Sequence, residues 1–173
     1  MRSAMRMVLG LVVTVAVAAP AAAQMIPPPA RVANLSGPRF GLTALDSGVV
    51  QKLKDDDGIE VSRTISQFGW QFEKQFYSKH DGPAMITEAI ALVGGLEQGV
   101  ALPSLSWLVG LRTQDGTEFG LGPNVTPVGV ALALAAGKTF RAGVLNVPVN
   151  VAVVPSKAGM RVSFLTGFAL RNR

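Results

Sequence analysis

Aromatic and polar residues alternate along Phe68-Gly69-Trp70-Gln71-Phe72-Glu73-Lys74-Gln75-Phe76, with Lys74 as the exception. Successive side chains of a β-strand point to opposite faces, so this stretch predicts a strand with one aromatic face and one polar face. Two opposite arrangements satisfy the pattern. In a soluble barrel the aromatic residues face the core, whereas in a membrane barrel they face lipid and the polar residues line the lumen.

The same period of two recurs from Arg39 onward, with breaks at Gly, Pro, Asp or Asn. Such short alternating segments are typical of successive antiparallel strands. The sequence therefore predicts an all-β fold, an eight-stranded antiparallel up-and-down barrel with one short helix in its first long connection. The eight strands are expected at residues 39–46, 61–77, 84–93, 100–113, 117–125, 127–140, 144–154 and 160–171.

One short helix is expected at Ser47–Asp55. Ser47 is its candidate N-cap, and Val49, Val50 and Leu53 share one face at spacings of three and four. We expect a helix of this length to pack over one end of the barrel.

The sixth and seventh predicted strands are apolar on both faces. In the sixth, Val128, Val130, Leu132 and Leu134 alternate with Gly and Ala. The seventh repeats this pattern less purely: four Val residues alternate with Asn146, Pro148, Asn150, Ala152 and Val154. Large residues that face hydrocarbon and small residues that fill a narrow lumen explain both strands. A two-sheet sandwich that covers these strands with other protein is the alternative, although one short helix leaves little chain for the cover.

The turn Gln114-Asp115-Gly116 predicts the register of one hairpin. A three-residue hairpin loop commonly ends on a residue with positive φ, which Gly116 accommodates. This register pairs Arg112 with Glu118 and Leu111 with Phe119, so residues of like character meet. A two-residue loop would set Arg112 against Phe119, and we therefore prefer the three-residue loop.

The N-terminal residues predict export. Arg2 and Arg6 precede an apolar run at 8–19 that is too short to cross a bilayer as a helix, and small residues at 21–23 follow. This is the pattern of a secretory signal peptide. We expect a signal peptide at 1–23, a Pro-rich lead-in at 24–38 that serves as a tether, and a β-barrel domain at 39–171.

The composition excludes several classes of protein. A chain of 173 residues has room for one domain of ordinary size, and the absence of Cys excludes disulfides and thiolate metal sites. Without Arg2 and Arg6, the 16 basic residues become 14 against 11 acidic ones, a net charge of about +3. These basic residues are scattered along the chain, so no nucleic-acid partner is expected.

Four charged residues fall on the small or polar faces of the predicted strands: Glu73, Arg112, Glu118 and Arg161. Inside a narrow barrel we expect them to pair with one another, because an unpaired buried charge costs several kcal/mol. A salt-bridge network that fills the lumen is the structural interpretation. A gated pore or a ligand contact is the functional alternative.

Glu88 conflicts with this pattern. It shares a strand face with Ile86, Ile90 and Leu92, an apolar face that we expect to point outward. Glu88 is therefore predicted to lie near lipid at an interface or next to a bulge in its strand.

No catalytic, cofactor-binding or metal-binding residue is predicted. His80 is the only imidazole, so it cannot form a His-rich metal site, and no serine lies in a suitable elbow for a triad. Asp55-Asp56-Asp57-Gly58 lacks the acids that a calcium loop needs at its first and twelfth positions, and Gly120-Leu121-Gly122 lacks the third glycine of a dinucleotide-binding motif. The spacing of Glu73, Glu88 and Glu118 matches no acid–base pair on one turn or one known loop.

The chain resembles the small outer-membrane β-barrel proteins of Gram-negative bacteria. The resemblance covers roughly residues 39–170. It rests on the export signal, the absence of Cys, the eight predicted strands and the last strand Val162–Leu170, which is apolar at most alternate positions. It implies the outer membrane as location, the lipid bilayer as partner and insertion by the barrel-assembly machinery.

We expect from this resemblance a non-enzymatic outer-membrane barrel with a filled or nearly filled lumen, no cofactor, and a structural or surface-interaction role. The alternative is a soluble periplasmic β-barrel or sandwich that binds a small apolar ligand, with Phe68, Trp70 and Phe72 turned inward. An exported hydrolase is a third hypothesis.

Overall fold

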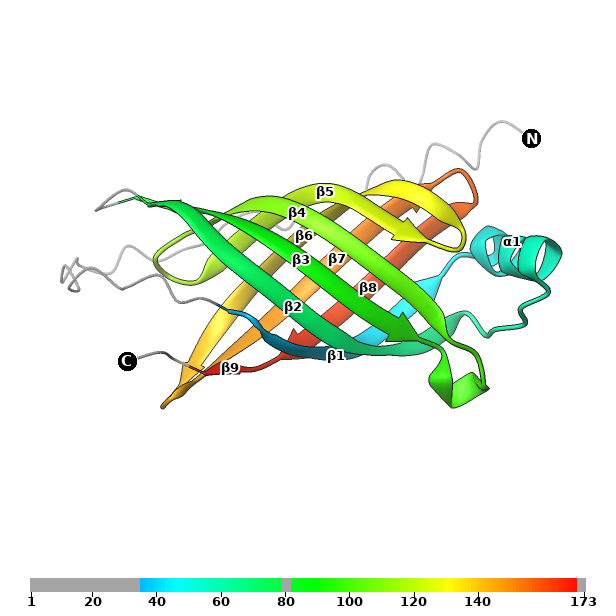
Figure 1. The fold of residues 1–173 in the computed structure, drawn as a ribbon, viewed down its shortest axis with the longest axis horizontal. Helices are drawn as coiled ribbons and strands as arrows, with labels where there is room; N and C mark the ends of the chain where they lie inside the picture. Colours follow the sequence, from blue (N-terminus) through cyan, green and yellow to red (C-terminus); the bar gives the residue numbers. More distant parts are fainter. Residues whose placement is uncertain (1–34, 79–81, 171–173) are drawn as a thin grey trace, which may run out of the picture.

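The computed structural model describes residues 35–78 and 82–170, which form a closed β-barrel (Figure 1). The predicted all-β fold with eight antiparallel strands and one short helix after the first strand is confirmed. The elements are β1 (Gly37–Leu45), α1 (Ser47–Asp57), β2 (Thr64–Ser78), β3 (Ala84–Gly94), the 3₁₀ helix η2 (Leu96–Gln98), β4 (Leu102–Arg112), β5 (Thr117–Thr126), β6 (Gly129–Ala142), β7 (Leu145–Ser156), β8 (Gly159–Gly167) and the two-residue strand β9 (Ala169–Leu170).

The strands pair in chain order, each antiparallel to the next, and β8 returns to β1 to close the ring. Along this seam Gly41 lies opposite Leu165 and Thr43 lies opposite Ser163. Closure pairs both long edges of the sheet, which an open sheet would leave exposed. After β8 the chain continues into β9, which pairs with β7.

The two ends of the barrel differ (Figure 1). The connections that follow β1, β3, β5 and β7 lie at one end together with α1, and we call this the helix end. The start of β1, the last residues of β2, β4 and β6, and β9 lie at the opposite end, which we call the terminal end.

The β4–β5 hairpin has the predicted three-residue loop and the predicted register. The Thr113 N–H donates to the Thr117 carbonyl oxygen at 2.8 Å, and Gly116 has a φ of 85°. The Asp115 carboxylate accepts hydrogen bonds from the Thr113 and Thr117 hydroxyls, which lowers the pKa of this carboxyl below its ordinary value of 3.8. A glycine at the positive φ and side-chain bonds to both strands therefore fix the loop.

Helix α1 closes the helix end with an apolar contact, as predicted. Val49 and Leu53 are buried against Leu45, Ile65 and Leu102, which come from β1, β2 and β4. The helix is amphipathic, so its other side chains remain in contact with solvent.

The ends of α1 follow standard capping chemistry, although the N-cap is not the predicted residue. Asp46, rather than Ser47, has the extended backbone of a cap, and its carboxylate accepts from the Gly48 N–H at 3.3 Å. Asp and Ser cap helices about equally well, so the sequence alone did not separate them. Gly58, with a φ of 65°, ends the helix. No helix among the described residues is long and apolar enough to cross a membrane.

Strand β3 differs from the prediction. Ile86, Glu88 and Ile90 all point into the barrel, so the apolar face of this strand lines the interior, and the prediction that Glu88 lies toward lipid or beside a bulge in its own strand is wrong. Ile90 packs there with Leu108 of β4 and Leu165 of β8. An apolar face alone does not tell whether it points inward or outward, because the interior of this barrel contains an apolar layer of its own.

The β2–β3 hairpin does contain an irregularity, which lies on β2. The pairing register shifts between Gln75 and Tyr77, so Phe76 and Tyr77 are both exposed on the outer surface. A bulge of this kind places two consecutive residues opposite one residue of the partner strand, which alters the alternation from that point on.

Bulky apolar side chains point outward on all eight long strands. Trp70 is 46% exposed, Trp107 60% and Val130 71%. The inner faces of β6 and β5 carry Ala133 and Gly122, which are buried. The distribution of large residues outside and small residues inside, which was predicted for the sixth strand, therefore applies to much of the barrel.

Gly122 and Gly120 offer a matched test of the narrow interior, because both lie on the inner face of β5. A Cβ at Gly122 would lie 1.9 Å from the Trp107 carbonyl oxygen, whereas a Cβ at Gly120 would meet nothing closer than 3.6 Å. We expect Gly122→Ala to lower the free energy of unfolding by about 1–3 kcal/mol. Gly120→Ala should leave it unchanged or raise it by about 0.4–1 kcal/mol. Denaturant unfolding of the folded protein measures both, and equal losses would contradict the packing described here.

Candidate functional site

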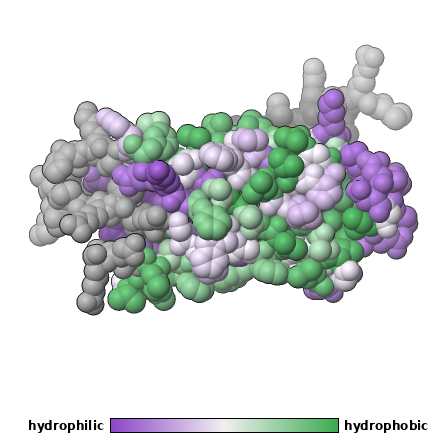
Figure 2. All heavy atoms as spheres, in the orientation of Figure 1, coloured by the Kyte–Doolittle hydropathy of each residue, from purple (hydrophilic) through white to green (hydrophobic). Residues whose placement is uncertain are grey.

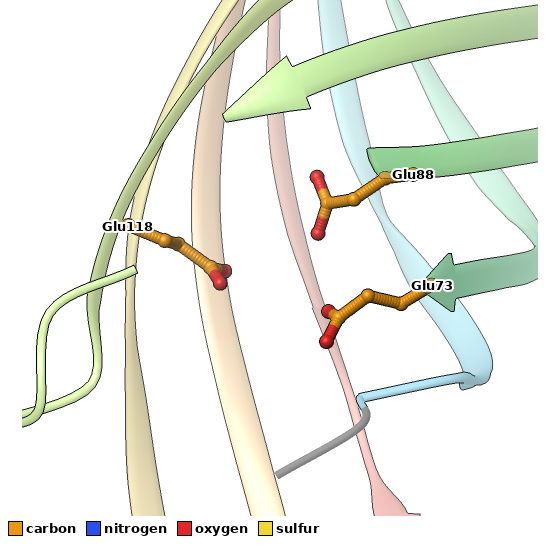
Figure 3. Close-up of side chains that lie close together, drawn as sticks. All are labelled: Glu73, Glu88 and Glu118. Carbon is orange, nitrogen blue, oxygen red and sulfur yellow. The ribbon is translucent and has the colours of Figure 1, made fainter. Parts of the chain in front are cut away.

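Six charged side chains are buried among the described residues: Arg39, Glu73, Glu88, Arg112, Glu118 and Arg161. The first five lie together toward the terminal end, and we call them the charged cluster. Glu73, Glu88 and Glu118 project from β2, β3 and β5, and their carboxylates point toward one another across the interior (Figure 3). One oxygen of each carboxylate lies within 4.8 Å of the others.

Arg112, the last residue of β4, connects two of these carboxylates. Its Nη1 donates to Glu73 Oε1 at 2.6 Å, and its Nε and Nη2 donate to Glu118 Oε2 at 2.8 and 2.6 Å. Glu88 Oε1 lies 3.8 Å from Arg112 Nη2. Bidentate bonds between a guanidinium and carboxylates are among the strongest polar contacts in proteins, so this group holds β2, β4 and β5 in a defined relation.

Gln71 links Glu88 to Arg39. Its Nε2 donates to Glu88 Oε1 at 2.5 Å, and its Oε1 accepts from Arg39 Nε at 2.9 Å. Both atoms of the amide have a charged partner, so the network determines the orientation of this side chain. The charged cluster thereby extends from β5 through β4, β2 and β3 to β1.

Leu35 and Ser36, which precede β1, form hydrogen bonds with two residues of the charged cluster. The Leu35 N–H donates to Glu73 Oε1 at 3.2 Å, and the Leu35 carbonyl oxygen accepts from Arg39 Nη2 at 2.5 Å. Ser36 Oγ accepts from the Glu73 N–H at 2.9 Å, and Leu35 is only 1% exposed. The end of the lead-in predicted at 24–38 is therefore part of the barrel, whereas residues 24–34 and the predicted signal peptide at 1–23 lie outside the described residues.

The structure brings together three of the four residues predicted to form an ion-pair set, Glu73, Arg112 and Glu118. The fourth, Arg161, lies apart, because β8 places it near the helix end, where it bonds to neutral partners. The prediction of one closed set of four is therefore corrected.

Arg39 is the charged residue that sequence reasoning missed. It lies on the inner face of β1, and the neighbouring residues on that face are Gly37 and Gly41. A face with two glycines in a short strand indicates the crowded side, and this signal would have placed Arg39 inside.

The other candidates from the sequence form no site. His80 lies outside the described residues. The last turn of α1 contains Asp55, Asp56 and Asp57, which are exposed. Asp56 forms an ion pair with Lys52. The motif Gly120-Leu121-Gly122 lies within β5, where no helix follows it.

Three carboxylates at this separation are a set that a hard cation can use. Here the guanidinium of Arg112 bonds to two of them and lies close to the third, so an arginine already supplies positive charge at the point where the carboxylates converge. The same bonds occupy both oxygens of Glu73 and Oε2 of Glu118, whereas Glu118 Oε1 has no hydrogen-bond partner among the described residues. The geometry supports a structural network that fills this end of the barrel.

Comparisons of the chain with models of known protein families, with curated proteins and with solved structures find no match.

The buried network predicts a large effect for loss of its arginine. Arg112→Met leaves Glu73, Glu88 and Glu118 close together with Arg39 as the remaining cation, so we expect a loss of about 3–5 kcal/mol in the free energy of unfolding. Lys138→Met is the control, because Lys138 bonds to Asp115 at 3.3 Å on the exposed surface. This control should cost no more than about 1 kcal/mol. Denaturant unfolding compares the two variants, and similar losses would contradict the role assigned to Arg112.

Proposed function

We propose that this protein is a non-enzymatic β-barrel of the outer membrane of a Gram-negative bacterium, with a filled interior and a structural or surface-interaction role. The outer surface is the observation that carries the proposal. Soluble monomers rarely expose a continuous apolar patch larger than a few hundred Å². Here exposed Phe, Trp, Leu, Val and Met side chains occur on all eight long strands.

The distribution of these side chains supports a bilayer as the surrounding solvent. Figure 2 shows apolar side chains across the middle of one face and hydrophilic ones at the helix end. A membrane barrel has an apolar outer band, and each of its strands needs about 9–11 residues to cross the hydrocarbon layer. The eight long strands have 9 to 15 residues, which is sufficient.

The filled interior supports a structural or surface role rather than an open pore. Val49 and Leu53 of α1 close the helix end, Ile90, Leu108 and Leu165 belong to an apolar layer in the interior, and the charged cluster fills the terminal end. A chamber of about 80 Å³ remains inside. This is room for several water molecules at ~10–15 Å³ each.

The alternative, a soluble periplasmic barrel that binds an apolar ligand, required Phe68, Trp70 and Phe72 to line the interior. All three side chains are exposed on the outside of β2. An apolar ligand inside the barrel would lack the aromatic wall expected for such a pocket, which favours the membrane proposal. The hydrolase hypothesis loses support because Arg112 bonds to two of the three candidate carboxylates.

Cell fractionation tests the proposed location. We expect the full chain, expressed in a Gram-negative host, to remain in the outer-membrane fraction after a carbonate wash, because strand side chains buried in lipid resist extraction at high pH. The closed ring should also give heat-modifiable migration in a detergent gel. A processed protein that appears in the wash as a soluble monomer would overturn the proposal.

A charged substitution on the outer surface separates lipid from water as the surrounding solvent. Leu134, whose strand neighbours are Leu121 and Val153, lies within the apolar surface, whereas Val144 lies in the β6–β7 turn. In a bilayer, Leu134→Arg should cost about 2–4 kcal/mol and Val144→Arg about 0–1 kcal/mol. In a soluble barrel both substitutions should stay within about 0.5 kcal/mol of the parent. Reversible unfolding from lipid vesicles measures the difference.

A further inference from the structure

Arg161 differs from the other two buried arginines in its partners. It is 8% exposed, and its Nη1 and Nη2 donate to Thr126 Oγ1 at 2.7 Å and to Asn124 Oδ1 at 3.0 Å. Its Nε has no hydrogen-bond partner within the described part of the chain, and no carboxylate there lies within salt-bridge distance of its guanidinium. A buried guanidinium with only neutral partners retains a positive charge that these contacts do not balance.

Asn124 connects Arg161 to two hydroxyl groups. With its Oδ1 bonded to Arg161, the Asn124 Nδ2 donates to Ser104 Oγ at 2.9 Å and to Ser106 Oγ at 2.9 Å. Both serines act as acceptors in these bonds, so each retains its own O–H as a donor. Arg161 and the two serines thus form a group that offers hydrogen-bond donors.

These three residues line the same interior chamber. The chamber of about 80 Å³ is also lined by apolar side chains, among them Leu108 and Ala133, and by polar ones, among them Gln67 and Asn150. Arg161 also lines a second pocket at the helix end, together with Lys157 of the β7–β8 turn and Asp55 and Asp56 of α1. The guanidinium therefore stands between the chamber and the mouth of the barrel.

We propose that the chamber binds a small monovalent anion, of the size of a halide or formate, at Arg161 Nε and the hydroxyls of Ser104 and Ser106. A single unbalanced guanidinium favours a single negative charge. The chamber volume admits a small ion and excludes a sugar or a nucleotide. An anion beside Arg161 would accept charge-assisted hydrogen bonds from these donors.

Glu88 also lines the chamber, but its contacts direct it to the charged cluster. Its Oε1 accepts from Gln71 and lies 3.8 Å from Arg112. The Glu88 carboxylate therefore interacts with Gln71 and Arg112, and it does not balance the positive charge of Arg161 at the helix end. The site depends only on the interior of the barrel, so it holds or fails independently of the proposed membrane location.

Bromide is a suitable probe, because its anomalous scattering identifies its position. We expect crystals of the full chain soaked in sodium bromide to show an anomalous peak in the chamber beside Arg161. In solution, bromide should raise the thermal unfolding midpoint relative to sodium gluconate at equal ionic strength, since gluconate is too large for the chamber. Absence of the peak from the chamber, or equal midpoints in the two salts, would overturn the proposal.

Substitutions test which residues bind the anion. Arg161→Gln should weaken bromide binding by about ten- to hundredfold, the range expected for loss of a charged hydrogen-bond donor. Arg63→Gln removes an exposed arginine and should leave binding unchanged. If Arg161→Gln does not fold, the double variant Ser104→Ala and Ser106→Ala, which keeps the guanidinium, decides the question. Unchanged bromide affinity in the double variant would refute a site built on these donors.

Discussion

The narrow interior of an eight-stranded ring constrains every inward-facing side chain of this protein. At Gly41, Gly69 and Gly122 an added Cβ would lie within 1.9 to 2.0 Å of a backbone oxygen of the adjacent strand. Aromatic side chains therefore have little room inside, and all those of the described residues are exposed on the outer surface, which carries bulky apolar residues on all eight long strands. The apolar exterior and the glycine-rich lining are two results of the same restriction.

The five side chains of the charged cluster are linked to one another by hydrogen bonds and ion pairs, directly or through Gln71. Three arginines and three glutamates are buried among the described residues, so the interior charges balance in number. They are not evenly placed, because the charged cluster holds two arginines with three glutamates and Arg161 stands apart. Buried ion pairs contribute little net stability, but Arg112 meets Glu118 only when the β4–β5 loop has three residues, so the pair specifies that register.

Much of the barrel follows from patterns that are local in the sequence. The eight strands, the short helix and the β4–β5 register depend on alternation and turn chemistry within a few residues, and the sequence predicted all three. The inward direction of Ile86 and Ile90 was missed, because alternation separates two faces without saying which one is inside. The bulge before Tyr77 was missed as well, since it depends on how β2 pairs with β3.

The charged site was predictable only in part, for the same reason. Glu73, Arg112 and Glu118 share polar or small faces that the sequence displays. Arg39 is linked to the other members of the charged cluster through Gln71. This hydrogen bond joins two residues 32 positions apart in the sequence, so no local pattern encodes it. The separation of Arg161 from the charged cluster likewise depends on where β8 meets β1 along the barrel axis.

The seam between β1 and β8 has a consequence for how the ring closes. Thr43 and Ser163 are 120 positions apart, yet their hydroxyl oxygens lie 2.7 Å from each other across this seam. Without the β1–β8 pairing, the sheet would have two unpaired edges, and such edges can pair with other chains. Closure of the ring therefore depends on the pairing of its first and last long strands, which joins residues farther apart along the chain than any other strand pairing described.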